Sequence, residues 1–132
     1  MNKNRIKKII IIAVALSGVI INAAYGISLL REFFAPQYDN AVREILISGI
    51  TLEFGWAALL GWVVLKPFER RHILLFTIIP ILLGNILHSA NQFINLHRSV
   101  GVVALNVGIG LLFSALYVGA YLLGKSGDES TK

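Results

Sequence analysis

The chain has 132 residues, of which 56% are hydrophobic and only 14% charged, and its formal net charge is +5. This composition excludes an ordinary soluble domain, because too few polar side chains remain to cover a water-exposed surface of this size. Cysteine is absent, which excludes disulfides, thiolate metal sites and iron–sulfur clusters.

Four apolar segments follow one another along the chain, each near the roughly 20 residues that a membrane-crossing helix needs. They cover residues 9–30, 41–65, 72–94 and 100–124. The first follows four cations in MNKNRIKK, and its length favours an uncleaved signal anchor over a cleaved signal peptide. We therefore predict an all-α membrane protein with a single domain, 1–124, whose four transmembrane helices form an up-down antiparallel bundle, and a short polar tail, 125–132.

Lys and Arg are distributed unequally between the two ends of these segments. If the N-terminus is cytoplasmic, nine of the 12 Lys and Arg residues lie on the cytoplasmic side, and only Arg31, Arg43 and Arg98 on the other. This excess is typical of cytoplasmic loops and predicts that both termini are cytoplasmic in a cell membrane. The basic residues form no stripe between exposed aromatic residues, so we expect a lipid bilayer as partner and no nucleic acid.

Turn-forming residues indicate where the second and third helices begin and end. Asp39 or Asn40 can cap the start of the second helix, and Pro67 ends it. Pro80 lies inside the third segment, where it removes one backbone hydrogen bond and is expected to kink the helix.

The first two segments each contain one polar residue beside small ones. Asn22 lies four residues from both Gly18 and Gly26, so its amide can bond across a close helix contact, or it can serve only to join helices. Glu53 shares a row with Gly49 and Ala57 and is the only acid near the middle of a segment. Within hydrocarbon a carboxylate has to be protonated, paired or wetted, which favours a functional role over a structural hydrogen bond.

The third and fourth segments have longer polar faces. At 100° per residue, one face of the third segment contains Gly84, Asn85, His88, Asn91, Gln92 and Asn95. One face of the fourth contains Asn106, Gly110, Ser114, Tyr117 and Tyr121, and we expect it to face the bundle centre. The opposite face is a strip of small residues, which predicts close packing on another helix, a second copy or a partner subunit: Gly101, Ala104, Gly108, Ala115 and Gly119.

Depth along the helices brings several polar residues to one level. At 1.5 Å per residue, five of them lie within about 8 Å of the membrane midplane, on its outer side: Asn22, Glu53, Asn85, His88 and Asn106. We therefore predict a solute or proton site that opens outward, made of Glu53, His88, Asn22, Asn85, Gln92 and Asn106. The pattern predicts no metal site and no catalytic residue, because no two of the three histidines can meet within one chain. It indicates no particular cofactor.

Three functions are compatible with this pattern. The first is binding or translocation of a small polar solute, cation or proton through the intramembrane polar cluster, with Glu53 and His88 exchanging a proton. The second is an accessory or assembly subunit of a membrane complex, in which the polar residues only set helix register. The third is an intramembrane enzyme that acts on a lipid-soluble substrate.

Overall fold

The computed structural model describes residues 3–94 and 99–128, apart from the side chains of Gln92 and of residues 126–128. The described residues form four helices: α1 Lys3–Phe33, α2 Asn40–Leu65, α3 His72–Ile94 and α4 Val100–Asp128. Each is long and apolar enough to cross a membrane, which confirms the prediction of four apolar spans. The start of α1 and the end of α4 extend beyond the apolar segments; in α1 the added residues include Lys3, Arg5, Lys7 and Lys8, which are good helix formers.

Capping determines where α2 begins and ends. Asp39 has an extended backbone, and its side chain accepts a hydrogen bond from the backbone N–H of Val42 at 2.9 Å. Asp39 is therefore the N-cap, and Asn40 is the first helical residue. The helix ends at Leu65, two residues before Pro67, as predicted. In contrast, α3 continues through Pro80 and does not end there.

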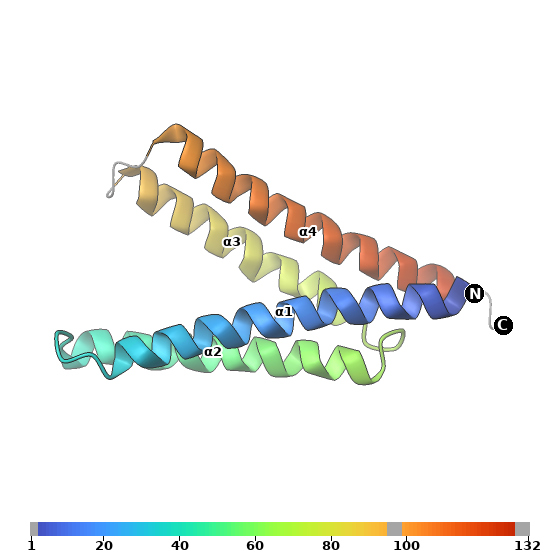
Figure 1. The fold of residues 1–132 in the computed structure, drawn as a ribbon, viewed down its shortest axis with the longest axis horizontal. Helices are drawn as coiled ribbons and strands as arrows, with labels where there is room; N and C mark the ends of the chain where they lie inside the picture. The colour runs from blue at the N-terminus through green and yellow to red at the C-terminus, as the bar shows by residue number, and fades with distance from the viewer. Residues whose placement is uncertain (1–2, 95–98, 129–132) are drawn as a thin grey trace.

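The four helices are arranged as two hairpins (Figure 1). One consists of α1 packed along α2, and the other of α3 packed along α4. Between the hairpins, α1 packs on α4, whereas α2 hardly touches α3. The hairpins meet where α1 begins and α4 ends, and they diverge toward the connection between α1 and α2. We call the first end the terminal end and the second the loop end.

A small buried core joins the hairpins at the terminal end. It contains residues from all four helices: Ile11, Ala15, Leu60, Val63, Leu74, Tyr117 and Ala120. Each of these residues belongs to the part of its helix that lies nearer the terminal end. Tyr117 is the largest fully buried side chain and is only 2% exposed. The core therefore closes the terminal end and leaves the loop end open.

Gly18 allows α1 to approach both α2 and α4 within this core. A Cβ atom at Gly18 would overlap the hydroxyl of Tyr117 and would lie 2.6 Å from Cδ1 of Leu60. Nearer the loop end, a Cβ atom at Gly26 would lie 3.1 Å from the ring of Phe54. The glycines of α1 are thus contact points for the other helices, which agrees with their predicted use in close packing.

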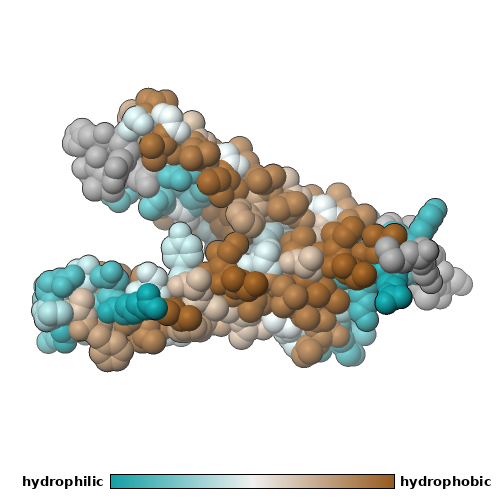
Figure 2. Space-filling model, in the orientation of Figure 1, coloured by the Kyte–Doolittle hydropathy of each residue, from teal (hydrophilic) through white to brown (hydrophobic). Residues whose placement is uncertain are grey.

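The outer surface is apolar between two polar ends (Figure 2). Hydrophobic residues cover most of the visible middle of the molecule, and hydrophilic residues gather at its ends. Many large apolar side chains of the spans are exposed, among them Ile20, Ile79 and Leu105. Exposed apolar surface of this extent is expected where lipid, and not water, surrounds the protein.

Candidate functional site

The polar residues of the spans lie on the loop-end side of the core. Asn22 follows the core residues of α1, and Glu53 precedes those of α2. Asn85 and His88 follow the core residue of α3, and Asn106 precedes those of α4. All four helices therefore contribute polar groups to the half of the molecule where the hairpins diverge.

Glu53 lies on the side of α2 that packs against α1. A Cβ atom at Gly49, one turn before Glu53, would lie 3.1 Å from Leu29 of α1. Since Gly26 of α1 faces Phe54, the helix register places Glu53 opposite the residues around Gly26. Glu53 is half-buried, and no hydrogen bond or ion pair to it is found among the residues that the structure describes.

Asn22 belongs to the same hairpin but bonds within its own helix. Its Nδ2 donates to the backbone oxygen of Gly18 at 2.7 Å. The side chain is half-buried, about one turn from the contact between Gly18 and Tyr117. Asn22 thus lies next to the closed core on its loop-end side, where α1 begins to separate from α4.

Asn85 and Asn106 join the two helices of the other hairpin. Nδ2 of Asn85 donates to the backbone oxygen of Asn106 at 2.8 Å. This contact depends on Gly110, because a Cβ atom there would lie 2.5 Å from Nδ2 of Asn85. His88, one turn further along α3, is exposed, and the side chain of Gln92 is outside the described part of the chain.

The six predicted site residues are therefore divided between the hairpins. The structure brings Asn85 and Asn106 into contact, and it places Asn22 and Glu53 on the α1–α2 hairpin. Because α2 and α3 hardly touch, the residues of one hairpin are separated from those of the other over most of the loop-end half. Within residues 3–94 and 99–128, no group of three or more His, Asp or Glu lies close enough to hold a metal ion.

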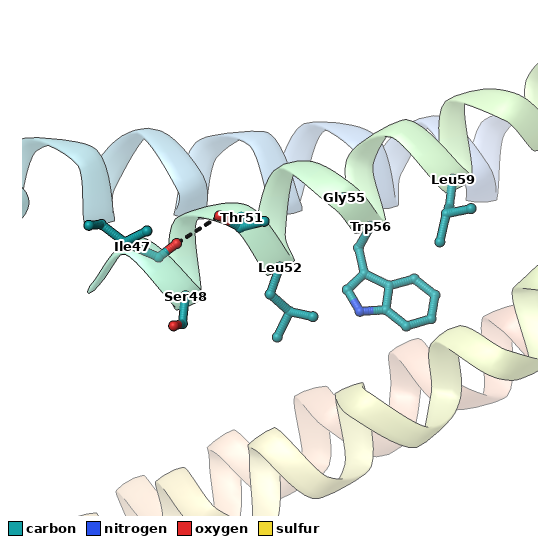
Figure 3. A pocket seen from close by; sticks show the side chains of 7 residues that line it. All are labelled: Ile47, Ser48, Thr51, Leu52, Gly55, Trp56 and Leu59. Carbon is teal, nitrogen blue, oxygen red and sulfur yellow. Dashed lines mark hydrogen bonds between the residues drawn. The ribbon is translucent and has the colours of Figure 1, made fainter. Parts of the chain in front are cut away.

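A groove of about 680 Å³ runs along α2 in this half of the molecule. Figure 3 shows its side chains, several of which extend from α2 toward the α3–α4 hairpin: it is lined by Ile47, Ser48, Thr51, Leu52, Gly55, Trp56 and Leu59. The hydroxyl of Thr51 donates to the backbone oxygen of Ile47 at 2.9 Å, so it is already bonded within its own helix. Most of the other lining residues are apolar, and the groove is therefore largely apolar. At 100° per residue, most of this lining is on the side of α2 away from Glu53.

Sequence reasoning did not include this groove in the site. Its polar residues, Ser48 and Thr51, donate hydrogen bonds to backbone oxygens of their own helix. Bonds of this kind are common in helices and do not indicate a binding role. The half-buried Trp56 and the exposed Gly55 on the same face are residue types that also occur on lipid-facing surfaces. All the residues that line the groove belong to α2, so it is a shallow, open face of this helix.

The two faces of α4 differ in the way the helical period predicts. Gly110, Ser114 and Tyr117 are buried against the other helices. On the opposite face, Cβ atoms added at Gly101 and Gly108 would meet no atom within 4 Å. The small-residue strip is therefore open, and its use by a second copy or a partner subunit stays a prediction.

Comparisons with protein-family models, with curated proteins and with solved structures found no match to this chain.

Proposed function

We propose that this protein is a multi-pass protein of the cell membrane that binds a small polar solute, a cation or a proton at Glu53. Access is from the loop end, where the hairpins diverge. The observation that supports this proposal is the half-buried carboxylate of Glu53, near the middle of a membrane-spanning helix, with no protein partner among the described residues.

The physical argument concerns the cost of a carboxylate inside the membrane. A charged side chain at the centre of a bilayer costs about 2.5–3.5 kcal/mol or more, so it is retained where something neutralises or solvates it. The α1–α2 contacts on either side of Glu53, Gly49 with Leu29 and Gly26 with Phe54, are apolar, and no ion pair to Glu53 is found among the described residues. A bound proton, cation or polar solute neutralises or solvates the carboxylate of Glu53, which no described residue does.

The remaining polar residues border the opening between the hairpins, and those that the structure describes form no hydrogen bond with this carboxylate. Asn22 lies close above the core on α1, and Asn85, His88 and Asn106 lie at a similar depth on the second hairpin. The core around Tyr117 blocks the way to the terminal end. With both termini cytoplasmic, as the positive-inside rule favours, the opening between the hairpins faces the outside, and a movement of the hairpins would be needed for translocation.

The proposal is tested by flux measurements on proteoliposomes that contain a trapped pH-sensitive dye. Proton movement is recorded after external addition of K⁺, Na⁺, tetramethylammonium or glycerol, each in turn. We expect Glu53→Gln to reduce the solute-dependent proton flux at least about tenfold, because the neutral amide neither binds a proton nor attracts a cation.

Glu44→Gln is the matched control. Glu44 is also an acid of α2, but it is exposed near the start of the helix, so its substitution should leave the flux unchanged. Equal flux in wild type and Glu53→Gln would refute the role of Glu53. Absence of any proton or solute flux in the wild type would refute translocation, and absence of saturable binding of these probes would refute the site itself.

A further inference from the structure

A second cavity lies at the terminal end, far from Glu53. Its volume is about 250 Å³, and it is formed by one residue of α1 and the segment that follows α2: Lys8, Leu65, Lys66, Pro67, Phe68 and Glu69. Two cations from separate parts of the chain thus line one shallow, open depression together with the apolar residues Leu65, Pro67 and Phe68. The apolar residues continue directly from the end of the membrane-spanning part of α2.

Positive charge exceeds negative charge in this cavity. Nζ of Lys66 lies 2.9 Å from Oε2 of Glu69, and the two side chains are 54% and 66% exposed. Exposed pairs of this kind are weak and screened by salt, so Lys66 can turn toward another anion at little cost. Lys8 is also exposed, so both ammonium groups are accessible from the surrounding medium.

Neighbouring residues place the cavity at the level of lipid headgroups. Trp62, one turn before the end of α2, is 48% exposed, and the guanidinium of Arg70 lies 4.1 Å from its ring centre. Nη1 of Arg70 also donates to the backbone oxygen of Trp62 at 2.9 Å. Exposed Trp residues paired with cations at helix ends are typical of the membrane interface. The lysines of the cavity lie just beyond this level.

We propose that this cavity binds the phosphate headgroup of an anionic phospholipid. The two lysines contact the oxygens of the phosphate, and the apolar side chains of Leu65 and Phe68 contact the glycerol and the first methylene groups. Basic pockets beside membrane helices on the cytoplasmic side are suited to such headgroups, because that leaflet carries the anionic lipids. The positive-inside orientation places the terminal end in this leaflet.

The test uses native mass spectrometry of the full chain, released from detergent micelles that contain phosphatidylglycerol or phosphatidylcholine with identical acyl chains. A lysine that donates a hydrogen bond directly to a phosphate contributes roughly tenfold or more to the affinity, whereas a lysine without a direct contact acts only through the screened field. We therefore expect the double variant Lys8→Gln/Lys66→Gln to bind phosphatidylglycerol at least about tenfold more weakly, with no change for phosphatidylcholine.

A second double variant, Lys3→Gln/Lys125→Gln, is the matched control. It removes the same charge from the same end of the molecule but from outside the cavity, and we expect less than about a twofold loss. Equal losses in the two double variants would show a general charge effect and overturn the proposal. Displacement of phosphatidylglycerol by an excess of inorganic phosphate would assign the cavity to free phosphate and would also overturn it.

Glu69→Gln tests the proposal in the opposite direction. Removal of this carboxylate frees Lys66, so we expect phosphatidylglycerol to bind about threefold or more tightly. A gain in binding cannot result from misfolding, which makes this variant independent of the lysine substitutions. Unchanged or weaker binding of phosphatidylglycerol to Glu69→Gln would contradict the assignment of Lys66 to the headgroup.

Discussion

The contact of Gly18 with Tyr117 and Leu60 holds the two hairpins together, so Gly18→Ala should loosen the molecule. The new methyl group would overlap the hydroxyl of Tyr117 and would lie 2.6 Å from Cδ1 of Leu60. Tyr117 is 2% exposed and Leu60 is fully buried, so neither side chain can move aside freely. Overpacking of this kind costs about 1–3 kcal/mol.

Gly61→Ala is the matched control for this prediction. Gly61 also lies within a membrane-spanning helix, but a Cβ atom there would meet nothing within 4 Å. Because both substitutions gain the same helix propensity of about 1 kcal/mol, the difference between the variants isolates the packing cost. We expect Gly18→Ala to be about 1–3 kcal/mol less stable than Gly61→Ala.

The assay is unfolding by SDS titration in mixed micelles, followed by the fluorescence of the two Trp residues. Adding Tyr117→Phe to Gly18→Ala removes the overlapping hydroxyl and should recover part of the loss, while the contact with Leu60 remains. A double-mutant cycle therefore gives a coupling energy between positions 18 and 117. Equal stability of Gly18→Ala and Gly61→Ala, together with zero coupling to Tyr117, would refute the close contact of Gly18 with Tyr117 and Leu60.

Two further predictions concern single helix contacts and use the same unfolding assay. Gly110→Ala should displace the side chain of Asn85 and lose its interhelical hydrogen bond, at a cost of about 1–3 kcal/mol, whereas Gly108→Ala, which meets no atom within 4 Å, should be neutral or stabilising. If both alanine variants have the same stability, the close approach at Gly110 has no energetic role. Asp39→Ala should lower stability by about 1 kcal/mol through loss of the N-cap of α2, whereas Asn40→Ala should have almost no effect. An unchanged Asp39→Ala variant would mean that water caps this helix equally well.

Local features of the sequence predicted each helix correctly, because span length and capping depend on residues close together in the chain. The apolar runs gave four spans, and Asp39 and Pro67 marked the ends of α2. The predicted and observed helix bounds differ most at the start of α1 and at the end of α4, where polar residues continue the helix. An apolar run measures the hydrocarbon thickness, whereas a helix ends only where its backbone hydrogen bonding ends.

The helical period also predicted which face of α4 packs on the other helices of the chain, whereas the small-residue strip, predicted to pack on a helix, a second copy or a partner, is open within this chain. Gly110, Ser114 and Tyr117 share one face of α4 and are buried, as expected from their spacing. The same rule could not say which helix each face would meet. The row that contains Glu53 packs on α1, and the side chain of Asn85 bonds to α4, so the two belong to different hairpins. Depth within the membrane is set along one helix, but proximity between helices depends on their lateral arrangement.

By itself, the sequence determined the number and order of the helices that are long and apolar enough to cross a membrane, since both follow from local hydropathy and helix geometry. The tertiary structure alone decided that the helices pair as two hairpins that meet at one end. It also decided that a groove lies along α2, and that Lys8 and Lys66 line one depression at the terminal end. These features depend on contacts between residues far apart in the chain, such as Gly18 with Tyr117, whose partners no local pattern specifies.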